Sequence, residues 1–406
     1  MPDAAVIERD CVITGGGPAG MVLGYLLARA GLRVTVLEKH ADFLRDFRGD
    51  TIHPSTIALL RGLGLAEEFL ELPLSRVDTL DTVIDGTRLT LVDFSTLPPP
   101  DDFLVFAPQW DFLDFLARKG SELPGFDLRL RAAGVDLVVE GDRVVGVRAT
   151  GPLGDFELRA PLTVAADGRD STLRERAGMH PVEFGAPIDV LWFRLPKAEG
   201  APPPTLAYVS ADGVVLTLDR RDYYQAGVII SKGRFDVIRA AGLPAFRARV
   251  AAAAPHLAAT ADSLLDWGQV SLLTVRLDRL PSWHRPGFIA IGDAAHAMSP
   301  MFGVGVNYAI QDAVALANAV HDPLARGSAP DGVLAAVQSR RERPARRMQR
   351  LQRISHLGVV RVARGGRRRA VPRPVLAVLR RHAPRIRRFL ARFIGLGYLP
   401  ERSEIR

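Results

Sequence analysis

The chain contains little cysteine and little lysine, and it has no long apolar segment that is free of glycine and proline. Its 406 residues include one cysteine, Cys11, so an internal disulfide is excluded and a reducing, cytoplasmic location is expected. Residues 11–28 carry no charge, but five glycines and Pro18 interrupt them, and acidic residues precede them. The sequence therefore predicts neither a membrane-spanning helix nor a targeting segment.

Positive charge is concentrated at one end of the chain. Only four of the 53 basic residues are lysines, and residues 340–406 contain 21 arginines against three acidic residues. That segment carries a net charge of +18, whereas the whole chain carries +8, so the preceding residues carry −10. We interpret the tail as a helical segment with a solvated basic face. No nucleic-acid partner is expected, and weak contact with a membrane surface is the alternative.

The pattern of apolar residues predicts an α/β fold. Residues 11–14 read as a buried strand, residues 21–31 as a helix and residues 32–40 as a second strand, which together form a βαβ unit of a parallel sheet. The buried-strand-and-turn pattern returns at residues 162–178 and 287–298. Alternating β-type residues fill most of the sequence between. A parallel-sheet domain interrupted by a mostly β domain is the expected architecture.

A glycine-rich loop, GGGPAG, separates the first strand from the first helix. Gly15, Gly17 and Gly20 have the spacing that allows a tight turn, close approach of a pyrophosphate, and close helix–sheet packing. Glu38 ends the second strand, where an acid accepts hydrogen bonds from a ribose. The pattern predicts dinucleotide binding without deciding between NAD and FAD. No second fingerprint lies between residues 132 and 287.

Two later motifs suggest a particular family. DGRDSTLR (Asp167 to Arg174) has the form D-G-x-x-S-x-x-R, and GDAAHAMSPMFGVGVN (Gly292 to Asn307) has the form G-D-x-x-H-x-x-x-P-x-x-G-x-G-x-N. In their order and spacing the three motifs resemble those of the group A flavoprotein aromatic hydroxylases, the p-hydroxybenzoate hydroxylase-like family. The resemblance covers most of the chain. It implies a glutathione-reductase-type FAD-binding Rossmann domain with an inserted β-sheet substrate domain.

The resemblance also implies domain limits and cofactor contacts. The expected limits are 1–75, 101–180 and 271–340 for the FAD domain, 76–100 and 181–270 for the substrate domain, and 341–406 for a basic helical C-terminal segment. The residues expected to bind FAD are Gly15, Gly17, Pro18, Ala19, Gly20, Glu38, Lys39, Arg48, Gln109, Asp167, Gly168, Gly292, Asp293, Pro300, Gly303, Val304, Gly305, Val306 and Asn307. Asp293 is expected to accept the ribityl hydroxyls. Relatives often have glutamine where this chain has Val304.

The implied activity is monooxygenation of an aromatic or other electron-rich small molecule. NADH or NADPH would reduce FAD, O₂ would add to give a flavin hydroperoxide, and the substrate would take one oxygen atom. Catalytic residues are not identified, and His53, Pro300 and Phe302 are candidates for the flavin face. The pocket candidates, each of which could instead pack in the sheet, are Trp192, Phe193, Tyr208, Tyr223, Tyr224 and Gln225. His296 is expected to be structural.

Other functions stay open at this point. A flavin-dependent halogenase would carry a W-x-W-x-I-P segment, and LPSWHRPG at residues 280–287 does not match it. A polyprenyl reductase is a second enzymatic alternative. A non-catalytic nucleotide-binding protein with a docking tail is the alternative of another class. The histidines show no metal-ligand spacing, so no metal is expected, and the oligomeric state is open.

Overall fold

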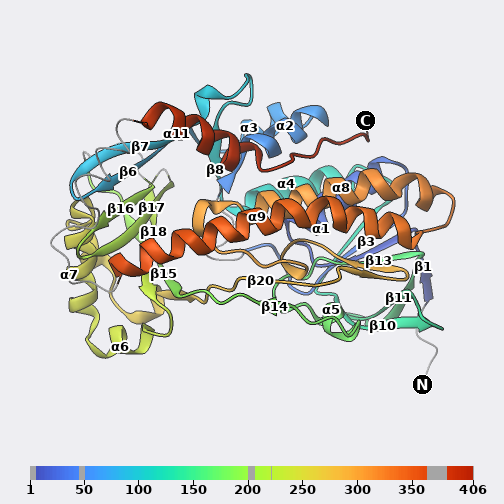
Figure 1. Ribbon diagram of the computed structural model, residues 1–406. Helices are drawn as coiled ribbons and strands as arrows, with labels where there is room; N and C mark the ends of the chain where they lie inside the picture. Colours follow the sequence, from blue (N-terminus) through green and yellow to red (C-terminus); the bar gives the residue numbers. More distant parts are fainter. Residues whose placement is uncertain (1–5, 45–50, 200–205, 221, 364–381, 406) are drawn as a thin grey trace.

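The computed structural model describes residues 6–44, 51–199, 206–220, 222–363 and 382–405. A mainly parallel sheet covered by helices forms one side of the molecule, and a mainly antiparallel sheet forms the other (Figure 1). Within those ranges, no helix is both long enough and apolar enough to cross a membrane.

The first sheet has six strands in the order β21-β22-β13-β2-β3-β9. All neighbours are parallel except β21 and β22. Its strands are β21 (His284–Arg285), β22 (Phe288–Ala290), β13 (Leu162–Ala165), β2 (Cys11–Thr14), β3 (Val34–Glu38) and β9 (Phe126–Leu130). Every residue of β2, β3, β13 and β22 is buried, as expected for parallel strands covered on both faces. The predicted α/β class is confirmed.

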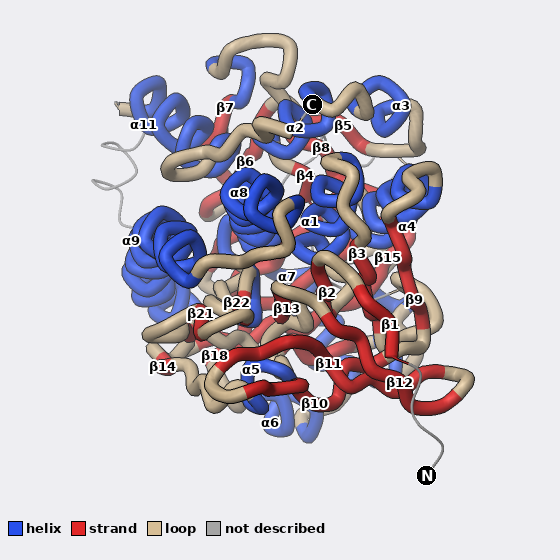
Figure 2. The backbone as a smooth tube through the Cα atoms, turned by 90° about the vertical axis from the view of Figure 1, so that its right-hand side faces the viewer, coloured by secondary structure: helices blue, strands red, loops and turns tan. Residues whose placement is uncertain are grey.

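Two layers cover this sheet. Helices α1 (Pro18–Arg29), α4 (Gln109–Ser121) and α8 (Gly305–Ala325) pack together on one face. On the other side lie a four-stranded sheet and the short helix α5 (Figure 2). These elements are β1 (Val6–Glu8), β12 (Gly154–Arg159), β11 (Arg143–Gly151), β10 (Ala133–Glu140) and α5 (Thr172–Arg176).

The second large sheet has seven strands in the order β19-β15-β18-β17-β16-β6-β7. They are β19 (Ser271–Leu273), β15 (Ile188–Pro196), β18 (Tyr223–Ser231), β17 (Gly213–Arg220), β16 (Ala207–Ser210), β6 (Thr79–Ile84) and β7 (Thr87–Asp93). Two stretches far apart in sequence, 79–93 and 188–273, therefore share one sheet. The detailed division into domains stays a prediction.

Side chains alternate between the two faces of this second sheet. Leu191 and Phe193 pack with Phe246 of helix α7 (Leu243–Ala253), in one apolar cluster. Val190 and Trp192 belong to another cluster, which includes Met298. We call the first, which contains Phe246 of α7, the α7 cluster. We call the second, which contains Met298 and Val304 of the loop before α8, the loop cluster. The loop cluster also receives residues from α9 (Asp331–Ala363), a helix that crosses the expected boundary at residue 341.

The remaining elements are short. Strands β4 (Thr51–Ile52), β8 (Leu104–Phe106) and β5 (Ser75–Val77) form a small sheet, and β14 (Val182–Glu183) pairs with β20 (Asp278–Arg279). The other helices are α2 (Pro54–Gly62), α3 (Ala66–Leu70), α6 (Phe235–Ala240) and α11 (Ala383–Leu390), with short turns of helix η1 (Phe94–Thr96), η2 (Pro255–Leu257), η3 (Ala261–Ser263), η4 (Trp267–Gln269), η5 (Gly292–Ala294), η6 (Met301–Gly303) and η7 (Ala391–Leu396).

Candidate cofactor and substrate site

The predicted binding motifs meet at one edge of the parallel sheet. Gly15 follows β2, Glu38 ends β3, Asp167 follows β13 and Gly292 follows β22. These four strands are neighbours and point in the same direction. Ligands of open α/β sheets bind at the carboxyl ends of such strands. The geometry therefore joins motifs more than 250 residues apart into one candidate site.

Two glycines of the first glycine loop have no room for a side chain, whereas a third does. Gly15 has a φ of 101°, and a Cβ there would lie 2.3 Å from the Ala166 carbonyl oxygen. A Cβ on Gly20 would lie 1.9 Å from the carbonyl oxygen of Gly15. At Gly17, by contrast, a Cβ would meet no atom within 4 Å. Gly15 and Gly20 are thus needed for the fold itself, whereas Gly17 faces open space.

Glu38 holds the glycine loop in place. Its side chain is buried and accepts hydrogen bonds of 3.0 Å from the backbone N–H groups of Gly16 and His40. Lys39 is exposed beside it. The carboxylate thus fixes the loop in addition to any contact that it makes with a ribose.

The second motif is explained by contacts with the third. Ser171 caps helix α5, accepting from the Arg174 backbone N–H, and donates from its hydroxyl to Asp167. The buried Arg174 side chain donates to the carbonyl oxygens of Ala294 (3.1 Å) and Arg169 (2.8 Å). Arg169 in turn bonds Asp293 at 3.0 Å. Burial raises the pKa of Asp167, so this carboxyl is harder to ionise than an exposed one.

The third motif contacts the first at its opening glycine. Gly292 has a φ of 60°, and a Cβ there would lie 3.3 Å from the Cβ of Ala19. Its N–H donates to Asp312 of α8 (3.1 Å), which also bonds Nε2 of His296 at 2.5 Å. His296 is therefore held inside the protein by a carboxylate, which fits the structural role expected for it.

The end of the third motif forms a tight loop before α8. Phe302 and Gly303 have φ values of 71° and 64°. Val304 is buried in the loop cluster and precedes α8 without any side-chain cap. Asn307 accepts from Ser55 (2.7 Å) and Thr56 (3.2 Å), while its Nδ2 is buried and has no partner in the described part of the chain.

These features fit a dinucleotide that carries a second ring system. Helices α1 and α8 both begin without a side-chain cap, so their first N–H groups are available to acceptors on a ligand. Gly17 and Gly305 leave open space at the two helix starts, and Asn307 offers an unpaired amide. The donor set fits FAD, and the assignment of one helix start to the phosphates and the other to the flavin ring stays a prediction.

His53 couples the loop before α8 to the C-terminal region. Its ring is buried, with Nδ1 2.9 Å from the Ile394 carbonyl oxygen and Nε2 3.0 Å from the Gly303 carbonyl oxygen. The Thr51 hydroxyl also contacts the Gly303 carbonyl oxygen, at 3.0 Å. His53 thus lies between Ile394 and the loop that carries Phe302 and Gly303. Its contact with a flavin stays a prediction.

The ionisation of His53 predicts a pH dependence of stability. Burial lowers the pKa of His53 below its ordinary value of 6.5. The unfolded chain therefore binds a proton below that pH that the folded chain does not yet take up. We expect the free energy of unfolding to fall as the pH is lowered from about 7 to about 5, and H53Q to make that fall shallower. Urea titrations of the wild type and H53Q across this pH range test the prediction. Parallel plots of the free energy of unfolding against pH for the two proteins would contradict it.

The aromatic pocket candidates are divided between the two faces of the seven-stranded sheet. Trp192 lies in the loop cluster with Met298 and Phe302. The other face carries Phe193, Tyr208 and Tyr224, which pack in the α7 cluster. Gln225 donates to the Phe193 carbonyl oxygen at 3.0 Å, and Tyr223 packs beneath Arg194. The structure places Trp192, but not the α7-cluster residues, in the cluster that also contains Met298 and Phe302 on either side of Pro300.

Two other predicted contacts are less informative. Gln109 is half-buried at the start of α4, and Arg48 lies outside the described residues.

Sequence reasoning also missed the residues of α9 that support the third motif. Gln352 accepts from the Ser299 N–H (3.1 Å) and donates to the carbonyl oxygens of Ser299 and Met301. No motif marks this helix, so only the fold reveals its role.

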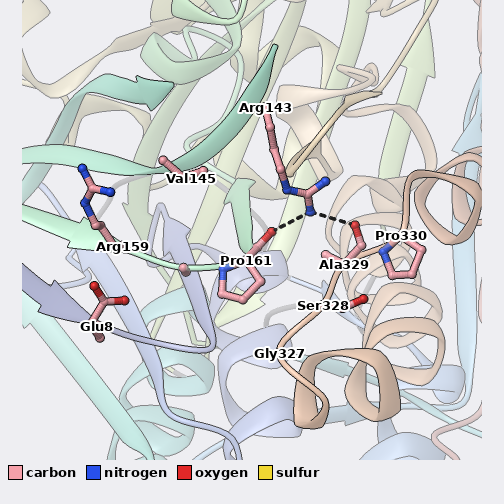
Figure 3. Close-up of a pocket in the computed structure, with 10 residues that line it drawn as sticks. Glu8, Arg143, Val145, Arg159, Pro161, Gly327, Ser328, Ala329 and Pro330 are labelled. Atoms are coloured by element: carbon pink, nitrogen blue, oxygen red, sulfur yellow. Dashed lines mark hydrogen bonds between the residues drawn. The ribbon is translucent and has the colours of Figure 1, made fainter. Parts of the chain in front are cut away.

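A separate pocket of about 560 Å³ lies away from these motifs (Figure 3). Pro161 lines it just before β13 and Glu8 lines it at the end of β1, three residues before β2, on the side opposite to the glycine loop. Gly327 to Pro330 line it beyond the far end of α8, whose 21 residues span about 30 Å. Arg143 donates there to the carbonyl oxygens of Pro161 and Ala329. This pocket is not part of the candidate cofactor site.

Comparisons with known proteins agree with the geometry. A family model described as FAD binding domain matches residues 8–352. The chain is 32% identical over 404 residues to 6-methylpretetramide 4-monooxygenase of Streptomyces rimosus, covering 96% of this chain and 93% of that protein. It is 30% identical over 348 residues to 12-dehydrotetracycline 5-monooxygenase/anhydrotetracycline 6-monooxygenase of Streptomyces rimosus subsp. rimosus, covering 82% of this chain and 67% of that one.

A solved structure shares the fold. Anhydrotetracycline hydroxylase from Streptomyces rimosus matches with a TM-score of 0.76 at 24% identity, covering 96% of this chain and 76% of that chain. The match extends across both large sheets, since nearly the whole chain is covered. At this identity the likeness concerns the fold.

Proposed function

The chain belongs to the family of FAD-dependent aromatic hydroxylases, and from that membership we propose that it hydroxylates a polycyclic aromatic molecule. It is an FAD-dependent monooxygenase, for which an aromatic substrate, O₂ and a reduced nicotinamide nucleotide are the reactants. The near full-length similarity to 6-methylpretetramide 4-monooxygenase carries the proposal of a polycyclic substrate. By their names, the two relatives act on 6-methylpretetramide and on 12-dehydrotetracycline and anhydrotetracycline.

We propose the following division of roles in cofactor binding. The backbone N–H groups from Gly15 to Gly20 hold the pyrophosphate at the start of α1, where the helix dipole favours negative charge. Glu38 contacts the ribose next to the adenine, and Asp293 accepts from the ribityl hydroxyls. The N–H groups of residues 303–307 face the flavin ring at the start of α8. FAD supplies the redox chemistry that activates O₂ after reduction by NADH or NADPH.

The protein's own contribution at the reacting face is to exclude water and to orient the ring. Pro300 and Phe302 belong to the loop that joins the FAD-binding sheet to α8, and Phe302 packs against the loop cluster, which also contains Trp192. Apolar side chains from several separate parts of the chain meet in this cluster, including Met348 of α9 and Ile394. A flat apolar substrate is suited to such walls, because its ring surface leaves water on binding.

The alternatives to monooxygenation fit less well. The named relatives are monooxygenases, and the segment expected of a halogenase is absent from the sequence.

Cytoplasmic location remains our proposal. Weak contact of α11 with a membrane surface is also proposed, since Phe389 is 62% exposed among arginines. Cosedimentation with anionic vesicles would test that contact, and no binding at low salt would exclude it.

A turnover assay tests the proposed function. The purified protein should be yellow and should oxidise NADH or NADPH faster when anhydrotetracycline is added than when p-nitrophenol is added. The product should be heavier by one oxygen atom, and ¹⁸O₂ should supply that atom. Absence of FAD from the purified protein would contradict the cofactor assignment. Stimulation by p-nitrophenol alone would contradict the polycyclic substrate.

Asp293 provides a test of the cofactor contacts. We expect D293A to raise the dissociation constant of FAD about tenfold, because a carboxylate acceptor for ribityl hydroxyls is lost. D170A is the matched control, since Asp170 lies in the neighbouring loop with its side chain 79% exposed. Flavin fluorescence, followed while FAD is titrated with the apoprotein of each variant, measures the dissociation constant of FAD. Equal FAD affinity in D293A and the wild type would show that Asp293 does not contact the cofactor.

A further inference from the structure

One buried ring nitrogen of the loop cluster and another on a histidine beside Ser299 lack partners. Nε1 of Trp192 and Nδ1 of His356 make no hydrogen bond to any described residue. The two residues are 6% and 1% exposed, so water does not satisfy them freely. Buried nitrogen groups are nearly always paired, and an unpaired one calls for an explanation. A ligand that supplies acceptors is one such explanation.

Trp192 presents its indole on the face of the sheet that belongs to the loop cluster. The ring lies on Gly227 of the neighbouring strand, where a Cβ would be 2.8 Å from ring atoms. Met298 and Phe302 of the third motif belong to the same cluster. Indole nitrogen can only donate a hydrogen bond. Its missing partner is therefore an acceptor.

His356 approaches the same loop from α9. Met348, Gln352, His356 and Val360 follow at intervals of four and so lie along one face of the helix, and Met348 and Val360 belong to the loop cluster. Helix α9 also packs against β17 and β18 of the seven-stranded sheet. Helix α9, which carries His356, thus lies against that sheet, and His356 itself contacts the third motif at Ser299.

The contacts of Ser299 determine which nitrogen of His356 carries the hydrogen. The Ser299 hydroxyl oxygen accepts from the Met301 N–H at 3.2 Å and lies 2.8 Å from Nε2 of His356. Among the described residues the Ser299 hydroxyl hydrogen meets no acceptor other than Nε2, so we assign its donation to Nε2, which leaves the hydrogen of a neutral ring on Nδ1. Burial lowers the pKa of His356, so the ring stays neutral near pH 7. The unpaired Nδ1 is therefore a donor as well.

We propose that Trp192 and His356 form a pair of hydrogen-bond donors for oxygen atoms of the aromatic substrate. The pair selects ring systems that bear carbonyl or phenolate oxygens over hydrocarbon rings of the same shape. A site built to bond a polar group discriminates strongly against analogues that lack it, because the buried groups are then left unpaired. This inference rests on the proposed function and adds to it the chemistry by which the substrate is recognised.

Other unpaired nitrogens in the chain provide matched controls. Nε1 of Trp283 is also buried and unpartnered, but Trp283 lies in the core of the FAD-binding side, against His296. Nδ1 of His256 is unpartnered as well, and its ring stacks on Tyr208 on the α7-cluster face. Neither residue belongs to the loop cluster. Loss of either nitrogen should leave substrate selection unchanged.

Equilibrium dialysis of the FAD-loaded protein tests the proposal with two probes. 9,10-Anthraquinone carries two acceptor oxygens and no donor, whereas anthracene has the same three rings without oxygen. We expect wild-type protein to bind anthraquinone at least about tenfold more tightly than anthracene. W192F and H356F should each reduce that preference about tenfold, H356Q should retain more of it, and W283F and H256F should leave it intact.

Several results would overturn the inference. Equal affinity of the wild type for the two probes, or failure to bind anthraquinone, would do so. So would an undiminished preference in W192F and H356F. Flavin content and circular dichroism of each variant show whether it folds and retains FAD. Absence of FAD from the wild-type protein would count against the proposed function instead, so the two failures are distinguishable.

Discussion

Replacement of Arg341 by alanine should destabilise the protein by about 3–5 kcal/mol, the cost of removing one partner from a buried ion pair. Arg341 is 1% exposed and donates to Asp312 at 3.0 Å and to Glu401 at 3.3 Å. Both carboxylates are buried, so neither can be compensated by water once the guanidinium is gone. Urea unfolding of the variant measures the loss.

The neighbouring arginine is the control for this prediction. Arg340 also pairs with Glu401, at 2.7 and 2.8 Å, but its side chain is 63% exposed. R340A should therefore cost less than about 1 kcal/mol. Similar losses in R340A and R341A would contradict the argument from burial. Because Asp312 also holds Gly292 and His296, R341A should release FAD more readily than R340A does.

Local patterns were sufficient to predict the first βαβ unit. The expected strand at residues 11–14 is β2, because four consecutive apolar or β-branched residues suit a strand buried on both faces. The helix begins at Pro18 rather than Met21, since proline fits the first turn, where its missing N–H costs nothing. The second strand is shorter than expected, at Val34–Glu38. Such differences arise at ends, where sequence patterns are weakest.

Helix α9 shows what local patterns could not supply. Pro344 lies inside its 33 residues, and a proline normally ends or kinks a helix. Tertiary contacts favour continuation here, since Ala345 and Met348 are fully buried in the loop cluster. The helix supplies Arg341, Gln352 and His356 to partners at least 29 residues away in sequence. Their roles depend on the fold, and no spacing rule reveals them.

The site was predicted in outline, through motifs that lie at strand ends. Gly15, Asp167 and Gly292 all follow parallel strands, so their convergence follows from the topology. The substrate side was harder to predict. Aromatic residues in β15 to β18 alternate between two faces, and without the register Trp192 could not be separated from Tyr208 or Tyr224. Alternation is visible in sequence, but which face meets the loop is not.

Replacement of Gly17 by alanine should abolish tight FAD binding while leaving the fold intact. Gly17 has a φ of −76°, which alanine adopts without strain, and its added Cβ would meet no protein atom within 4 Å. The open space at this position is where we propose that the pyrophosphate lies, so the methyl group would collide with the cofactor. We expect the dissociation constant of FAD to rise about a hundredfold, the larger end of the cost of overpacking.

The outcome depends on a contrast between two glycines of one loop. G20A places a Cβ 1.9 Å from the Gly15 carbonyl oxygen, so it should lower the free energy of unfolding of the apoprotein itself. G17A should leave that free energy within about 0.5 kcal/mol of the wild type, as for a surface substitution. Apoprotein unfolding and FAD titration, measured on both variants, separate the two effects. If G17A bound FAD as tightly as the wild type, the pyrophosphate could not approach the backbone at Gly17.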